Sequence, residues 1–387
     1  MTTSTPSSSH PSSPPLRLAD VGELIAALPA LMGFPPVRSI VVMCLTPSGI
    51  APSRPTARTA SIGAVMRHDL LIPGPGEPVP DRMDEAFRRF RAVCAREGAE
   101  SVAAVLVDDR LTDPGADGIA DLCRLVDVFA DRLDVVGIDL AGVYAVPEIA
   151  AGATWFVPGR DVSGRVADPA ASVVAAARVY EGSPIRGSRD ELAALLAPYP
   201  SAVRQEVARC IDEVVDSRDR EYERVARSGG GERADRLELE TVLAHIRAHA
   251  AGTSLSPSDH AELAVLLANR TVRDAVMGLA NGALARDAER LWIELARVLP
   301  DPERADAAAL VGFGAYVRGD GPLAGVAFAA ALGSDPRHRL SDLLDQALQA
   351  GLRPDAIRGL AETGHEIASR LGVTLPPPEG GDRTSGH

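Results

Sequence analysis

Acidic side chains lie where two predicted strands meet their loops. The run SVAAVLVDD has the apolar pattern of a buried strand and ends in Asp108 and Asp109, and a later strand region, DVVGIDLAGVYAV, contains Asp139. In open α/β sheets ligands bind beyond the carboxyl ends of strands, and paired carboxylates there could hold a divalent metal for hydrolysis. The alternative is that these acids only cap the next segment, since Asp is common in turns. We predict that they bind no metal tightly.

His245 and His249 stand four residues apart in the sequence HIRAH, so both could reach a metal ion from one face of a helix. Zinc sites need three or four protein ligands, and no further ligand is evident apart from Glu238 or Glu240. The other interpretation is a solvated or interfacial histidine pair, which we prefer. We therefore expect no cofactor.

The segment GFPPVRS follows a helical pattern and precedes a strand pattern. A phosphate-binding loop points backbone N–H groups at the anion from the start of a helix, whereas this segment follows a helix and Pro35 has no N–H. Gly33 fits a left-handed cap at the end of the helix, so we predict a structural corner. Arg38 and Ser39 are the candidates there for contact with a ligand.

Several catalytic classes are excluded by residue type. The chain has no lysine, which excludes Schiff-base chemistry and the lysine of a P-loop. There is no HExxH motif, no nucleophile elbow and no glycine fingerprint. Ser188 and Glu191 form the S-x-x-E pattern of a capping box, which needs no functional explanation.

Composition limits the partners and the compartment. The formal charge of -13 opposes nucleic acid and anionic membranes, so we expect neither as a partner. The N-terminus has no apolar signal region and no run approaches a membrane span, which indicates a cytoplasmic protein. Free, buried thiols in a reducing compartment are expected for the four cysteines, Cys44, Cys94, Cys123 and Cys210.

Two structural halves are predicted. Strands and amphipathic helices alternate in residues 16–160, which indicates an α/β domain with a mostly parallel sheet and flanking helices, and the strand signals stop after Gly159. Helical patterns then form a connector, residues 161–228, and an all-α domain, residues 229–372, with a flexible break at Gly229 to Gly231. Residues 1–15 and 373–387 are predicted to be disordered tails.

The C-terminal half carries a repeat-like pattern. A small residue, an aromatic residue, a second small residue and a proline occur at the offsets of tetratricopeptide repeats, at Ala324, Phe328, Ala331 and Pro336. Thirty-six residues earlier the corresponding positions are Ala288, Trp292, Leu295 and Pro300. The pattern predicts stacked helix pairs that resemble this repeat family and bury Trp292 and Phe328. An unrelated helical bundle is the alternative.

The chain also resembles an actinobacterial family, the domain-of-unknown-function family 4192. The resemblance rests on LMGFPPVRSIVVMCL, on SRDEL at Ser188 to Leu192, and on GDGPLAGVAFAAALGSDPRHRLSDLLDQAL. The family implies no established activity. Our leading hypothesis is a non-catalytic interaction or scaffold protein with a protein or peptide partner on the helical domain. The alternatives are a metal-dependent hydrolase using Asp108, Asp109 and Asp139, and a small-molecule or nucleotide sensor.

Overall fold

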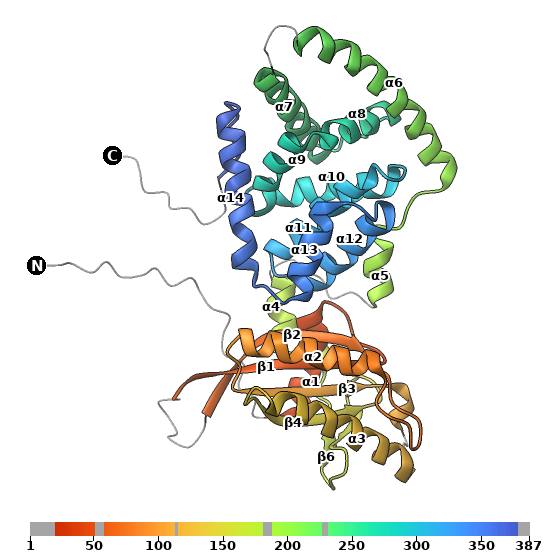
Figure 1. The fold of residues 1–387 in the computed structure, drawn as a ribbon, viewed down its shortest axis with the longest axis vertical. Coiled ribbons are helices and arrows are strands. Elements are labelled where there is room, and N and C mark those ends of the chain that lie inside the picture. Colours follow the sequence, from red (N-terminus) through yellow and green to blue (C-terminus); the bar gives the residue numbers. More distant parts are fainter. Residues whose placement is uncertain (1–19, 51–57, 113–114, 181–187, 227–230, 378–387) are drawn as a thin grey trace, which may run out of the picture. The chain divides into compact units, whose positions relative to one another are not determined.

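The computed structural model describes residues 20–50, 58–112, 115–180, 188–226 and 231–377 (Figure 1). The chain divides into two compact units, Met1–Gly187 and Ser188–His387. The division between the units therefore falls inside the predicted connector, residues 161–228. The predicted tail of residues 1–15, most of the other predicted tail, and Gly229 and Gly230 of the predicted break lie outside the described residues. Within the described residues, no helix combines the length and the apolar character that crossing a membrane requires.

The first unit is built on a six-stranded sheet. Its strands are β1 Ser39–Ile50, β2 Arg58–Asp69, β3 Ser101–Val107, β4 Asp139–Val146, β5 Thr154–Phe156 and β6 Ser163–Arg165. Its helices are α1 Val21–Met32, α2 Asp81–Arg96, α3 Gly115–Asp134 and α4 Val173–Tyr180, with single 3-10 turns η1 Asp109–Thr112 and η2 Pro169–Ala171. The Asp20 side chain caps α1 by accepting a hydrogen bond from the Gly22 N–H at 2.8 Å.

The sheet is mixed, so the prediction of a mostly parallel sheet is wrong. The strand order is β2-β1-β3-β4-β5-β6, and in the described part of the chain β3 and β4 are the one parallel pair of neighbours. A parallel connection needs about a dozen residues or more, usually including a helix. The segment between Ile50 and Arg58 is too short for that, so β1 and β2 pair as antiparallel neighbours. Helix α3 supplies the crossover from β3 to β4.

The prediction that strands end at Gly159 is also wrong. Strand β6 pairs with β5 through the register Trp155 to Gly164, and the indole of Trp155 lies over that glycine. A Cβ atom on Gly164 would lie 2.6 Å from Trp155 Cζ2, so the site requires a residue without a side chain. The sequence Ser-Gly-Arg has little strand propensity, and tertiary packing decides its conformation.

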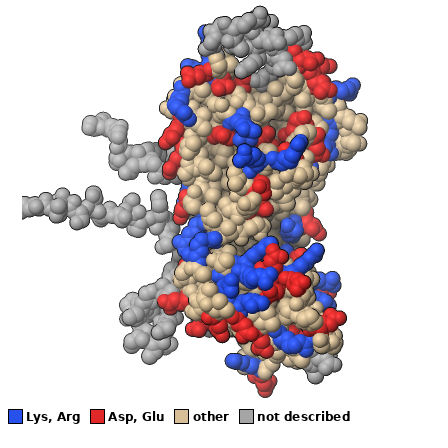
Figure 2. Space-filling view, viewed as in Figure 1, with Lys and Arg blue, Asp and Glu red and all other residues tan. Residues whose placement is uncertain are grey.

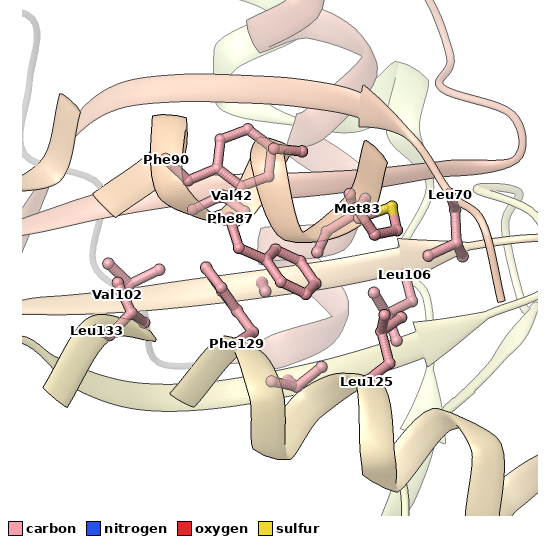
Figure 3. Packing of buried hydrophobic residues seen from close by; sticks show 14 of the residues in the cluster. Val42, Leu70, Met83, Phe87, Phe90, Val102, Leu106, Leu125, Phe129 and Leu133 are labelled. Carbon is pink, nitrogen blue, oxygen red and sulfur yellow. The ribbon is translucent and has the colours of Figure 1, made fainter. Parts of the chain in front are cut away.

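Both faces of the sheet are covered. Side chains of alternate residues in β1 and β3 pack with α2 and α3, where Phe87 and Phe129 are in contact at a centroid distance of 4.8 Å. Figure 3 shows these two rings pointing toward one another between the helices and the sheet. Val41 and Val105, on the opposite face, are fully buried too, and Figure 1 shows α1 behind the sheet. Complete burial of such side chains is worth about 1.5–3 kcal/mol each and holds the layers together.

The second unit is helical in its described residues. Its helices are α5 Arg189–Ala194, α6 Ser201–Ala226, α7 Gly231–Ala250, α8 Pro257–Ala268, α9 Arg270–Val276, α10 Ala285–Val298, α11 Arg304–Val317, α12 Gly321–Ser334, α13 Arg339–Gln349 and α14 Pro354–Arg370, with the 3-10 turn η3 Met277–Asn281 between α9 and α10. Helix α11 packs against both α10 and α12. Every residue of α11 except Asp306 is buried, as expected for a helix that is apolar on all sides.

The aromatic positions of the repeat-like pattern lie in this core. Phe328 of α12 is fully buried and Trp292 of α10 is 4% exposed. The ring of Phe328 lies against Gly312 of α11 and meets Tyr316 edge-on at a centroid distance of 6.4 Å. The positions of Gly312 and Phe328 thus fit a tightly packed helix pair.

The residues that follow α14 pack against the helical core. Val373 is 8% exposed and Leu375 is 5% exposed. A Cβ atom on Gly278 would lie 2.8 Å from Leu375 Cδ1, which shows how closely this segment approaches η3. The expectation of disorder from residue 373 onward is therefore wrong for residues 373–375, because two apolar side chains anchor them.

Candidate functional site

The corner between α1 and β1 has the expected backbone. Gly33 ends α1 with φ 75° and ψ -4°, the left-handed conformation that a C-terminal cap requires. Pro35 lies in the short connection to β1 and cannot donate a backbone hydrogen bond. Arg38, just before β1, has φ 44°, a left-handed conformation that is uncommon for a residue with a side chain.

The guanidinium of Arg38 binds the carboxylate of Asp109 with two hydrogen bonds. Arg38 Nε donates to Asp109 Oδ1 at 2.8 Å, and Nη2 donates to Oδ2 at 3.0 Å. The hydrogen bond from Arg38 lowers the pKa of Asp109 to about 2. Both side chains are more than 60% exposed, so the pair orders the loop more than it stabilises the fold.

Asp108 is paired with a different arginine. Its carboxylate is fully buried and accepts hydrogen bonds from the Arg110 backbone N–H at 3.0 Å, from Arg110 Nε at 2.8 Å and from Arg110 Nη2 at 2.5 Å. The Asp108 N–H donates to Val146 O at 3.1 Å, which joins the ends of β3 and β4. A buried carboxylate needs a partner of opposite charge, and Arg110, two residues later in the chain, supplies it.

Ser39 has a structural role. Its side chain is fully buried, and its hydroxyl donates to Val37 O at 2.6 Å and accepts from Arg67 Nε at 2.8 Å. Arg67 also forms an ion pair with Asp69 at 2.6 Å. The sequence did not indicate Arg67 as a member of this group, because the hairpin register that brings β2 beside Ser39 was not recognised.

Asp139 lies at the other end of the sheet from Asp108 and Asp109. Asp139 is the first residue of β4 and pairs with Ser101, the first residue of β3, whereas Asp108 follows the end of that parallel strand. Seven residue steps of about 3.3 Å each, from Ser101 to Asp108, separate the two positions by roughly 23 Å. The three acids of the hydrolase hypothesis therefore do not converge, and that grouping is wrong.

His245 and His249 contact different carboxylates. His245 Nε2 is 3.0 Å from Glu262 Oε2 of α8, and His249 Nε2 is 2.9 Å from Glu294 Oε2 of α10. His260 Nε2 reaches the other oxygen of Glu294 at 2.8 Å. Glu238 and Glu240, the expected further ligands, are bound instead by Asn269 and Arg236.

The protonation of the two histidines beside Glu294 follows from their surroundings. Nδ1 of His249 and Nδ1 of His260 are buried and have no hydrogen-bond partner. Each Nε2 faces a carboxylate oxygen and must therefore carry the proton. These hydrogen bonds, that of His260 first, lower the pKa of Glu294. Glu294 thus acts as an acceptor between the two imidazoles.

The remaining predicted residues have structural positions. Ser188 Oγ accepts a hydrogen bond from the Glu191 N–H at 3.1 Å and caps α5. Cys44 and Cys94 are buried in the first unit with their sulfur atoms 3.2 Å apart. Cys123 and Cys210 are only half-buried, so the expectation of four buried thiols is wrong for these two.

One of three comparisons with known proteins gives a match. Neither the comparison with curated proteins nor that with solved structures finds a significant match. The family model described as Domain of unknown function (DUF4192) matches residues 22–355, which is most of the chain, and the chain therefore belongs to this family.

Proposed function

We propose that this protein is a non-catalytic interaction protein that binds a protein partner through its helical unit. One observation carries this proposal: both acids at the carboxyl end of β3 are bound by arginines of the chain itself. Arg110 occupies both oxygens of Asp108, and Arg38 occupies both oxygens of Asp109. A metal ion would have to displace a guanidinium from either carboxylate.

The helical unit supports the binding role. Successive helices are in contact, α10 with α11, α11 with α12 and α12 with α13, which fits stacked helix pairs of the tetratricopeptide-like kind. Helix α12 contains no charged residue, yet Ala329 and Gly333 are exposed on it. In Figure 2 the surface over α12 is largely free of charged side chains.

We propose that three exposed leucines contribute to the contact with the partner. Leu343 of α13 is 60% exposed, Leu352 after it is 36% exposed and Leu360 of α14 is 39% exposed. We name these three residues the leucine surface. Asp342 beside Leu343 is exposed, and the chain has a net charge of -13. Charge complementarity therefore favours a partner segment that has apolar side chains and basic residues.

Affinity purification from the cells that produce the protein tests the proposal. The wild type is compared with Leu343→Glu and with Leu237→Glu, a matched control because Leu237 of α7 is 56% exposed. A protein retained by the wild type is then purified and titrated against all three chains. We expect Leu343→Glu to weaken its binding by about tenfold or more and Leu237→Glu to leave it unchanged. Equal affinity for all three chains would contradict the leucine surface.

A small-molecule sensor is the second candidate, and the conformation of Arg38 favours it. Strained backbone is concentrated at binding sites and switches, and Arg38 combines φ 44° with an exposed pair to Asp109. An anionic ligand could compete with Asp109 for the guanidinium. Thermal shifts with nucleotides and inorganic phosphate, measured on the wild type and Arg38→Gln, test this function. A ligand-induced shift that is lost in Arg38→Gln would support it, and equal shifts in both chains would not.

A further inference from the structure

Three metal-ligand side chains converge between α7 and α8. His245 of α7 and Asp259 and Glu262 of α8 each offer one ligand atom, and these atoms all lie within 4.8 Å of one another. His245 Nε2 and Glu262 Oε2 are 3.0 Å apart. Two atoms that each lie about 2.1 Å from a tetrahedral zinc ion are roughly 3.4 Å apart. We propose that His245, Asp259 and Glu262 form a Zn²⁺ site in which water completes the coordination.

The protein holds the ligands in position. Asp259 Oδ2 accepts hydrogen bonds from the Ser256 N–H at 2.7 Å and from Ser256 Oγ at 2.6 Å, and these fix the carboxylate at the start of α8. The same carboxylate offers one oxygen to the cluster with His245 and Glu262. Ile246 of α7 and Leu263 of α8 are fully buried beside the ligands and anchor the two helices. Preorganised ligands lose little conformational freedom when the ion binds.

The local charge favours a cation. Asp259, Glu262 and Glu294 have imidazoles near them, and among the described residues no ion pair joins any of the three to an arginine. This differs from the sheet edge, where Arg38 and Arg110 neutralise the acids. Neighbouring carboxylates attract a divalent ion, whose two positive charges would offset part of their negative charge.

Hydrogen bonding selects His245 over the other two histidines as the ligand. A histidine that binds a metal through Nε2 must carry its proton on Nδ1. Nδ1 of His249 and Nδ1 of His260 are enclosed without an acceptor, so such a proton would be buried and unpaired. His245 is 16% exposed and its Nδ1 is not enclosed in this way, so water can accept that proton. The site is therefore assigned to His245.

Zn²⁺ titration of the full chain by calorimetry tests the assignment. The variants are His245→Gln, Glu262→Gln, Glu294→Gln and the control Glu240→Gln, whose side chain lies on α7 and is bound to Arg236. Glu262 is 46% exposed, so its replacement by Gln leaves the fold intact, and far-ultraviolet circular dichroism checks this for every variant. Replacing even a residue that only hydrogen-bonds to a metal ligand weakens metal binding by about 10- to 100-fold.

We expect one Zn²⁺ per chain, at least about tenfold weaker binding in His245→Gln and Glu262→Gln, and unchanged binding in Glu240→Gln and Glu294→Gln. Co²⁺ in place of Zn²⁺ should give the visible absorption of a tetrahedral ion in the wild type and lose it in Glu262→Gln. Absence of stoichiometric binding to the wild type would overturn the proposal. Equal binding by Glu262→Gln would overturn it too. Loss of binding only in Glu294→Gln would place the metal at His249 and His260 and would also overturn it.

Discussion

The ring of Phe328 lies so close to Gly312 that a Cβ atom on the glycine would be 2.4 Å from Phe328 Cε1. This contact brings α12 directly onto the backbone of α11, and both residues lie in the buried core of the second unit. A helix interior normally disfavours glycine by about 1 kcal/mol relative to alanine. At Gly312 the close approach of the Phe328 ring outweighs the general preference of helices for alanine over glycine.

We therefore predict that Gly312→Ala lowers the free energy of unfolding by about 1–3 kcal/mol, because the added methyl group overpacks the α11–α12 contact. Urea denaturation measures the change. Gly333→Ala is the matched control, since Gly333 is also helical and a Cβ atom there has nothing within 4 Å. That control should be neutral or more stable by up to about 1 kcal/mol. A Gly312→Ala protein as stable as the control would show that the two helices separate easily.

Truncation of the aromatic side chain probes the same contact from the other side. Phe328→Ala should cost about 3–5 kcal/mol, because the side chain is fully buried. In a stack of helix pairs the damage is carried by nearest neighbours. Hydrogen exchange should therefore show lost protection in Ser188–His387 and not in the sheet. Uniform loss in both units would mean a single cooperative core.

Gly33→Ala should lower the free energy of unfolding by about 1 kcal/mol, because an alanine is strained at φ 75° even though a Cβ atom there meets no neighbour within 4 Å. Thermal or urea unfolding measures the effect. Gly359→Ala provides the comparison, since Gly359 lies in α14 with open space around it and no positive φ. If both variants are equally stable, the left-handed cap has no energetic role.

The Glu294 carboxylate should make stability depend on pH. Its pKa is lowered from 4.5 by hydrogen bonds from His260 and His249. A lowered folded-state pKa gives stability that is fully present above the unfolded value and is lost as the pH falls through the folded value. We expect Glu294→Gln to be less stable than the wild type at pH 6–7 and the difference to shrink below about pH 4.5. A difference that stays constant to pH 3 would contradict this. Glu240→Gln is the control.

The helices were predictable where the pattern was local. Helix α2 begins at Asp81 and the α1 cap lies at Asp20 because periodicity and capping are visible within a few neighbouring residues. The β1–β2 hairpin and β6 were missed because strand pairing depends on distant partners and on packing.

The candidate sites, too, were predictable only where the pattern was local in the sequence. Asp108 and Asp109 were located, but their arginine partners depend on the loop fold, and Arg38 is 71 residues from Asp109. The contacts of His249 and His260 with Glu294 span 45 and 34 residues, so no short motif in the sequence reports them. The relation of Asp139 to the other acids required the strand register, which places it at the opposite end of β4.

We propose that Arg38 and Arg110 occupy the carboxylates of Asp109 and Asp108 and thereby keep a metal ion from binding at the sheet edge. Melting temperatures in millimolar Mg²⁺ or Mn²⁺ test this claim most directly, because selective binding to the native state raises the melting temperature. The wild type and Asp108→Asn are compared, together with hydrolysis of phosphate and carboxylate esters under the same conditions. We predict that neither ion raises the melting temperature through this site and that no metal-dependent hydrolysis occurs. A rise in the wild type that disappears in Asp108→Asn, accompanied by metal-dependent hydrolysis, would contradict the account and favour the enzyme.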